Sequence, residues 1–355
     1  MKDKIKYLIS GIGPGSSGVG RLMRVLAPKY EQNGYKVVYK REPKSIRSFL
    51  THRAYLLLTL EIFLRTRGKV LFLLKTYFIR NSEVVFLHPQ TAGYQLLFRM
   101  IASNKVSLYV MDNSFFCIRS YNTNPVSNAE CLNCVGTLKP NSLCNPFPIK
   151  MSLNDNSKYL NELKNVSDEI NFLAQNDLQG ELIKKHFGKQ TSVSVIGMDT
   201  NEASSIEKHP PVHSQIKSYD VVYHGASIIA KGLLYVIELA EELPEFEFFV
   251  PDSKDNIEKV VDRALPSNVV CRVVTWETGL KGIVSAAKIV INPSMWSAPI
   301  EGALLKSAAF NPNVATVATE YGFERESALI KNHLRLNNKI EIGALQLKKF
   351  LQEYV

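Results

Sequence analysis

Two stretches of the chain repeat one pattern, in which a buried strand breaks into a loop of small residues and continues as an apolar helix. They are Val221–Gly232 and Ala286–Thr319. Strand, loop and helix repeated in this way predict a parallel α/β sheet, with ligands expected where strands end and helices begin. The pair Lys231-Gly232 opens one helix, and Glu301 lies about one turn into another that Pro299 is placed to start. Such residues suit a charged ligand of the sugar or nucleotide kind.

The N-terminal part of the chain begins with the same order of elements. A strand over Ile5–Ser10 runs into the glycine-rich loop 11–20, and a helix over Arg21–Asn33 follows. The loop contains G-x-G-x-x-G as Gly13, Gly15 and Gly18. Such a loop brings backbone N–H groups close to a ligand, but a tight turn without a ligand has the same pattern. Binding of NAD(P) is a further alternative, although no group of residues for hydride transfer is evident.

The length of the chain indicates how many domains it forms, and its net charge indicates which kinds of partner it favours. A chain of 355 residues exceeds one ordinary core and predicts two domains. The net charge of +10 favours anionic partners, but the basic residues form no recognised nucleic-acid motif, so no nucleic acid is expected. The boundaries we predict are an N-terminal domain over 1–200, a linker over 201–219, a C-terminal domain over 220–340 and a final helix over 341–355.

Four of the five cysteines lie close together in the sequence: Cys117, Cys131, Cys134 and Cys144. They fall in the stretch 113–150, which shows no periodicity. It is predicted as a long loop of the N-terminal domain that needs a stabilising cross-link. In a cytosolic chain, such a group indicates a metal site before it indicates disulfides. Reduced thiols without a metal and an iron–sulfur cluster remain alternatives.

No signal peptide and no membrane-spanning run is evident, so we expect a cytoplasmic protein. Residues 44–80 combine leucine and aromatic residues with many lysines and arginines. They suit a surface that rests on an anionic membrane leaflet. Ordinary helices packed on the N-terminal sheet, with basic side chains reaching the solvent, are the alternative.

The order of the motifs resembles that of one family. These motifs are the glycine loop 11–20, Met111-Asp112 before the cysteines, the stretch Ser194–Asp199, Gly225-x5-Lys231-Gly232, and Asn292–Trp296 followed by the helix bearing Glu301. Together they resemble GT-B glycosyltransferases of the retaining family 4, or group 1, type, including members with a four-cysteine insert. The likeness runs from about residue 5 to residue 320.

The resemblance implies two Rossmann-like domains facing each other across a cleft. It implies transfer of a hexosyl group from a UDP- or GDP-sugar to a hydroxyl of a glycan or lipid-linked acceptor, in surface polysaccharide or glycolipid synthesis. No catalytic metal is required, a structural zinc ion is implied for the cysteines, and the protein is expected on the inner face of the cytoplasmic membrane. The catalytic candidates are Glu301, Lys231, Asp112 and His88. The donor-binding candidates are Gly13, Gly15, Ser16, Gly225, Ser227, Lys231, Gly232, Ser294, Trp296, Glu301 and Lys306.

The sequence departs from this family at charged positions. Ala226 stands where the family usually has an arginine, and Ala298 and Lys306 stand where it has two glutamates. Our hypothesis is that Lys306 supplies the lost positive charge and that Glu301 contacts the sugar or ribose. The alternative function is a non-catalytic GT-B-like protein that binds a nucleotide or glycan within a biosynthetic assembly.

Overall fold

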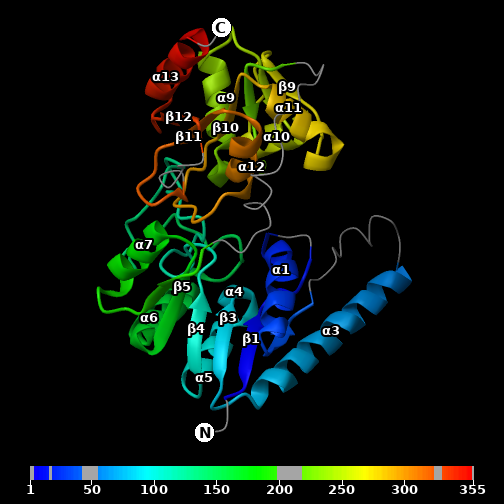
Figure 1. Ribbon diagram of the computed structural model, residues 1–355, viewed down its shortest axis with the longest axis vertical. Helices are drawn as coiled ribbons and strands as arrows, with labels where there is room; N and C mark the ends of the chain where they lie inside the picture. Colours follow the sequence, from blue (N-terminus) through cyan, green and yellow to red (C-terminus); the bar gives the residue numbers. More distant parts are fainter. Residues whose placement is uncertain (1–3, 16–17, 42–54, 198–217, 324–329, 354–355) are drawn as a thin grey trace. The chain divides into compact units, whose positions relative to one another are not determined.

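The computed structural model describes residues 4–15, 18–41, 55–197, 218–323 and 330–353. The described strands form two six-stranded parallel sheets with helices between the strands, which confirms the predicted α/β fold (Figure 1). The chain divides into two compact units. Unit 1 contains Met1–Met111 and Pro146–Thr200, and unit 2 contains Asp112–Asn145 and Asn201–Val355.

The sheet of unit 1 has the order β2-β1-β3-β4-β5-β6, and neighbouring strands are parallel. Its strands are β1 (Lys6–Ser10), β2 (Tyr35–Tyr39), β3 (Glu83–Leu87), β4 (Lys105–Tyr109), β5 (Ile170–Ala174) and β6 (Val193–Val195). Its helices are α1 (Gly18–Gln32), α3 (Tyr55–Tyr77), α4 (Pro89–Ala92), α5 (Tyr94–Ile101), α6 (Leu153–Asn165) and α7 (Asp177–Phe187). The order of the strands reverses at β1 and β3, so their carboxyl ends mark the place where this fold class offers a ligand crevice.

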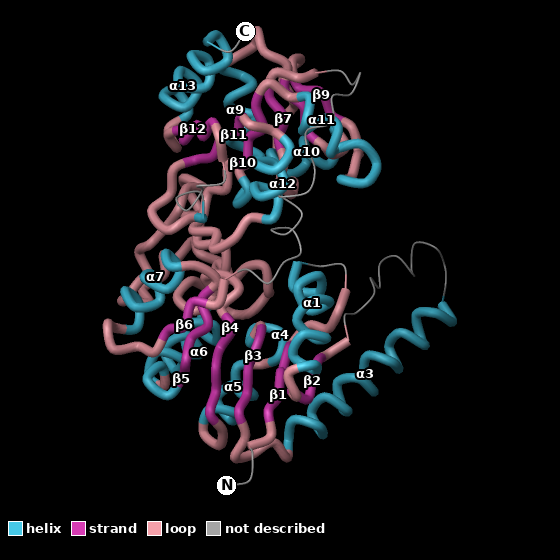
Figure 2. The backbone as a smooth tube through the Cα atoms, in the orientation of Figure 1, coloured by secondary structure: helices cyan, strands magenta, loops and turns pink. Residues whose placement is uncertain are grey.

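Unit 2 has the order β12-β11-β10-β7-β8-β9, so its reversal lies between β7 and β10 (Figure 2). Its strands are β7 (Val221–Tyr223), β8 (Phe248–Val250), β9 (Val269–Cys271), β10 (Ile289–Asn292), β11 (Asn313–Val317) and β12 (Asn332–Leu336). Its helices are α9 (Leu233–Glu242), α10 (Lys254–Val261), α11 (Lys281–Ala286), α12 (Gly302–Phe310) and α13 (Ile340–Glu353). The loops after β7 and β10 are the two stretches from which the sequence predicts a ligand site.

The sheet of unit 2 is buried on both faces. In β10, Ile289 and Ile291 belong to one apolar cluster while Val290 belongs to another. Successive side chains of a strand point to opposite faces, so each face has its own core under its own helices. This burial explains why the strands are near-continuous apolar runs that the sequence analysis could recognise.

The stretch with the cysteines packs differently from our prediction. The predicted N-terminal domain includes 113–150, whereas Asp112–Asn145 groups with unit 2. The reason is a set of hydrogen bonds with Ser297, in the loop after β10: Asn113 and Asn122 donate to it, and Glu130 accepts from its hydroxyl. The residues 198–217, which contain most of the predicted linker, lie outside the described residues.

Helix α3 exposes much of its apolar surface. Leu56 and Phe63 are 86% and 63% exposed, and its N-terminal half lies away from the strands of unit 1 (Figure 1). Among the described residues, no helix is both long and apolar enough to span a bilayer. The basic residues Lys44, Arg47 and Arg53 of the predicted membrane surface lie outside the described residues.

Candidate functional site

A lysine and two oxygen-bearing side chains meet at the carboxyl ends of β7 and β10. The Nζ atom of Lys231 forms an ion pair with Glu301, and Ser294 Oγ donates a hydrogen bond to the same carboxylate oxygen. Lys231 and Glu301 are only 18% and 12% exposed. Helix α12 begins at Gly302, three residues later than the predicted start at Pro299. Glu301 is therefore its N-cap residue, and the side chain of Glu301 makes no capping hydrogen bond. Its carboxylate is instead directed to Lys231.

Gly232 allows the two loops of the site to approach each other. Its φ of +78° lies in the left-handed region. A Cβ atom at this position would lie 2.0 Å from the carbonyl oxygen of Pro293, a distance that no real contact permits. Nearby, the N–H of Met295 donates to the carbonyl of Ala230 at 3.0 Å. Glycine is therefore required both for the turn and for the close contact.

Two aromatic rings lie beside the lysine. The Nζ atom of Lys231 is 4.9 Å from the centroid of the Trp296 ring and 6.0 Å from that of Tyr121. The two rings are 4.7 Å apart between centroids. Trp296 Nε1 is buried and has no hydrogen-bond partner among the described residues. The site thus combines a cation with two aromatic rings.

Asp112 and Tyr121 bring the cysteine-bearing segment into this site. Burial raises the pKa of the Tyr121 hydroxyl, and the charges of Asp112 and Glu301 raise it further. Asp112 Oδ1 also accepts a hydrogen bond from the N–H of Ser114 at 2.9 Å. Asp112 therefore groups with Lys231 in unit 2, and not with the N-terminal domain in which it was predicted. Tyr121 was not predicted, because nothing in its sequence context distinguishes it from other loop residues.

The last residue of β7, Tyr223, holds the backbone of the loop that carries Lys231. Tyr223 Oη donates to the carbonyls of Ala226 and Lys231, at 2.6 and 3.2 Å. A Cβ atom on Gly225 would lie 2.7 Å from this hydroxyl, so Gly225 provides the space for it. Ser227 is engaged elsewhere, with Asp252. Burial acts to raise the pKa of Asp252, but hydrogen bonds from Ser227 and two further donors outweigh it and lower the pKa.

Lys306 lies beside a different pair of rings. Its Nζ is 5.4 Å from the centroid of Trp276, which stacks on His224 at 5.3 Å. Burial, followed by the charge of Lys306, lowers the pKa of His224 to about 4, so this imidazole is neutral near pH 7. His224 Nδ1 lies 2.9 Å from Ser307 Oγ. The hypothesis that Lys306 replaces a lost diphosphate-binding cation stays a prediction.

The glycine loop of unit 1 is explained by packing. A Cβ atom on Gly13 would lie 2.4 Å from the ring of Tyr39. The N–H of Gly15 donates to the carbonyl of Gly20 at 3.1 Å, and a Cβ atom on Gly20 would lie 2.8 Å from the Cα of Gly15. These glycines are thus needed for a tight strand-to-helix turn whether or not a ligand binds. Ser16 lies outside the described residues.

His88 lies next to this loop at the carboxyl end of β3. It has a left-handed backbone with a φ of 53°, and its Nδ1 is 2.7 Å from Thr91 Oγ1. Gly11 packs against the same turn, because a Cβ atom there would lie 2.1 Å from Thr91 Oγ1. His88 and the glycine loop are therefore brought together in unit 1, whereas Lys231, Glu301, Ser294, Trp296 and Asp112 are brought together in unit 2.

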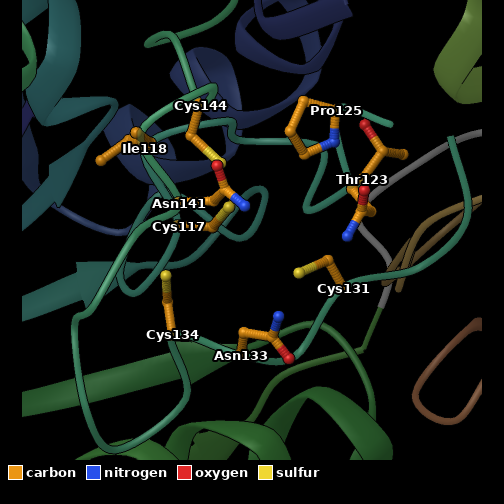
Figure 3. Close-up of a pocket in the computed structure, with 10 residues that line it drawn as sticks. Cys117, Ile118, Thr123, Pro125, Cys131, Asn133, Cys134, Asn141 and Cys144 are labelled. Atoms are coloured by element: carbon orange, nitrogen blue, oxygen red, sulfur yellow. The ribbon is translucent and has the colours of Figure 1, made fainter. Parts of the chain in front are cut away.

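The four cysteines line one cavity of about 20 Å³, which has room for one small occupant. Figure 3 shows their side chains turned toward the same space, and none of the four forms a disulfide. Burial raises the pKa of Cys117, and it raises that of Cys134 to about 11 with contributions from Cys131 and Cys144. Four thiols suit zinc, although no three His, Cys, Asp or Glu side chains of the described residues are already placed at metal-binding positions.

Comparisons with known proteins rest on structure alone, since neither a protein-family profile nor a curated sequence matches the chain. Sucrose-phosphate synthase from Thermosynechococcus elongatus has a TM-score of 0.58 and 12% identity, over 98% of this chain and 90% of that one. HepE from Anabaena, solved in complex with UDP, has a TM-score of 0.54 and 12% identity, over 99% and 90%. WaaG, a glycosyltransferase involved in lipopolysaccharide biosynthesis, has a TM-score of 0.53 and 14% identity, over 99% and 90%.

These similarities extend over nearly the whole of each chain. Together with the two parallel sheets, they show that the protein has the GT-B fold of glycosyltransferases, built from two Rossmann-like domains. At such low identity the likeness identifies the fold and leaves the activity to be argued from the site.

Proposed function

We propose that the protein is a glycosyltransferase that moves a hexosyl group from a nucleotide sugar to a hydroxyl of an acceptor. The observation that carries the proposal is the half-buried Lys231–Glu301 ion pair at the carboxyl ends of β7 and β10. This is where an open parallel sheet of this order binds its ligand. A lysine at this position suits the diphosphate of a sugar donor.

The chemistry follows from the charges. As the glycosidic bond breaks, the diphosphate leaving group gains negative charge, and a preorganised cation nearby lowers the energy of the transition state. Glu301 and the two rings hold the Lys231 ammonium in place. Glu301 also offers its second carboxylate oxygen to hydroxyls of the sugar or ribose. None of these roles requires a bound metal ion.

The nature of the donor and the stereochemistry are further parts of the proposal. UDP is favoured over GDP, because one structural neighbour was solved with UDP and another is a UDP-forming trehalose-phosphate synthase. Retention of the anomeric configuration is proposed from the resemblance to family 4 enzymes. A role in surface polysaccharide or glycolipid synthesis is supported by the likeness to WaaG.

The test is a ligand panel on the purified protein. A ligand that binds only the folded state raises the unfolding midpoint. We expect UDP and a UDP-sugar to raise it, GDP, CDP and ADP to have smaller effects, and the matching donor to be turned over in the presence of a glycan or glycolipid acceptor. Binding without any hydrolysis or transfer would favour the non-catalytic alternative, which the residues Ala298 and Lys306 motivate. A shift with NAD(P) alone would contradict the proposal.

We also propose that α3 rests on the cytoplasmic face of the membrane, where a lipid-linked acceptor would be met. Its exposed surface carries large apolar side chains, among them Leu56, Leu57, Phe63 and Leu74. Basic residues accompany them at Arg65, Arg67, Lys69 and Lys75. Glu61 is the one acidic residue of the helix, and it is buried and paired with Arg41 and Arg65. The exposed surface of α3 therefore suits an anionic leaflet.

The variant Leu56→Asp/Phe63→Asp is expected to lose vesicle binding. Each large apolar side chain that leaves water contributes about 1.5–3 kcal/mol, so removing two should lower the partition coefficient more than about tenfold. Cosedimentation with vesicles of phosphatidylcholine and phosphatidylglycerol measures this. Leu345→Asp is the matched control, because Leu345 is 69% exposed on α13. Equal losses in both variants would contradict a specific role of α3.

The four cysteines are proposed to hold a structural zinc ion. Their common cavity and their sulfur ligands support this, and zinc binding would stabilise thiolates that burial otherwise disfavours. Elemental analysis of the purified protein should find about one zinc per chain, and less in Cys134→Ser. Absence of zinc after purification with zinc in the medium would leave the cysteines as reduced thiols.

A further inference from the structure

The loop that follows β10 is held by side chains of the cysteine-bearing segment Asp112–Asn145. The bonds converge on Ser297. Its carbonyl accepts from Asn113 Nδ2 at 2.9 Å, its N–H donates to Asn122 Oδ1 at 3.1 Å, and its hydroxyl accepts from Asn122 Nδ2 at 3.0 Å. The same hydroxyl donates to Glu130. Every polar atom of Ser297 is therefore bound by this one segment.

These contacts are buried, which makes them sensitive to change. Asn113 and Asn122 are fully buried, and Ser297 is 2% exposed. Asn113 Nδ2 also donates to Asn122 Oδ1 at 2.7 Å, so the two amides and the serine form one network. A buried polar group that loses its partner costs about 1–3 kcal/mol, and deletions within one network are not additive.

Asn122 joins this network to the cysteines. Its Nδ2 donates to the carbonyl of Cys131 at 3.1 Å, and the N–H of Cys131 donates to the carbonyl of Asn122 at 2.7 Å. Cys131, which lines the thiol cavity, is thus hydrogen-bonded directly to Asn122, which in turn holds Ser297.

The loop in turn carries the candidate donor site. Ser294, three residues before Ser297, donates to Glu301, and Trp296 packs over the ammonium of Lys231. Tyr121, adjacent to Asn122, packs on Trp296 from the other segment. A shift of the loop would therefore move the partners of Lys231 on two sides.

We propose that Asn122 is a positioning residue of the nucleotide-sugar site. It acts through Ser297, sets the placement of Ser294 and Trp296 around Lys231, and makes the cysteine-bearing segment a determinant of donor affinity. The inference rests on the proposed function, because the affinity in question is that for the nucleotide.

The experiment is a double-mutant cycle. Asn122→Ala, Ser297→Ala and the double variant are made in the full-length protein, and the Kd for UDP and for GDP is measured by calorimetry well below the unfolding midpoint. We expect each single variant to weaken binding about tenfold and the double variant to be no weaker than the worse single. Asn133→Ala is the matched control, since Asn133 lines the thiol cavity on its exposed side. Its Kd should equal that of the wild type.

The outcomes separate the inference from the proposed function. If the wild type binds UDP or GDP and the folded variants bind equally well, Asn122 has no positioning role. Additive losses in the double variant would also overturn it, because the two residues would then act independently. Absence of any nucleotide binding by the wild type would contradict the proposed function itself. Should Asn122→Ala fail to fold, Ser297→Ala and Asn133→Ala still decide, since the serine variant removes only one oxygen atom.

Discussion

Lys231→Met is expected to remove nearly all transfer of the sugar while the protein remains folded. Methionine keeps the length of the side chain and its contact with the rings of Trp296 and Tyr121 but lacks the charge. Loss of one preorganised group that stabilises transition-state charge costs about 10²–10³ in rate. Release of the nucleoside diphosphate from the donor found in the ligand panel measures the effect, and the Kd for UDP should rise as well.

Lys254→Met is the control for a change of net charge. Lys254 lies on α10 with 65% of its side chain exposed, paired with Glu258 at 3.6 Å, and such exposed pairs contribute little. The turnover of the Lys254→Met variant should match that of the wild type. Glu301→Ala should also lower the rate of transfer, because the Glu301 carboxylate holds the Lys231 ammonium in place. If Glu301→Ala leaves both donor binding and transfer intact, the role assigned to Glu301 is wrong.

Gly232→Ala is expected to have the largest effect on stability. The left-handed backbone costs about 1–2 kcal/mol for alanine, and relieving the overlap with the carbonyl of Pro293 requires a backbone shift of about 1–3 kcal/mol more. The sum of roughly 2–5 kcal/mol should lower the unfolding midpoint of unit 2 by about 5–15 °C. Thermal and urea denaturation measure it.

Gly34→Ala separates the two contributions. Gly34 has a φ of +81°, close to that of Gly232, but an added Cβ atom would meet nothing within 4 Å. It should therefore show only the cost of the left-handed backbone, about 1–2 kcal/mol. Equal destabilisation by the two substitutions would mean that the contact between Gly232 and Pro293 does not hold the two loops together.

The fold was predictable because central strands such as β7, β8 and β10 are fully buried and mostly apolar. The strand predicted over Ile5–Ser10 was located to within a residue, since β1 covers Lys6–Ser10. The edge strand β12 was missed, since Asn332–Leu336 includes His333 and Arg335 and carries little apolar signal. The helix α6 was missed for a similar reason, because its buried apolar side chains are only Leu160 and Leu163.

Only those residues of the site that come directly after a predicted strand could be found from the sequence. Lys231 and Glu301 were found because each comes after a buried strand, but their direct pairing joins residues 70 positions apart and depends on the sheet order. Tyr121, Asn122 and Glu130 could not be found. They lie in a loop without periodicity, and no local pattern indicates which sheet such a loop contacts.

The bonds between Asn113 and Ser297 join residues 184 positions apart, and this separation has a consequence for synthesis on the ribosome. At about 5–20 residues per second, the segment with the four thiols emerges roughly 10–40 s before the loop that it must hold. The residues that line the thiol cavity all lie within 117–144, so this cavity can close before the C-terminal half is translated. The bonds to Ser297 can form only afterwards, so the segment acquires its own structure before it holds the loop of the candidate donor site.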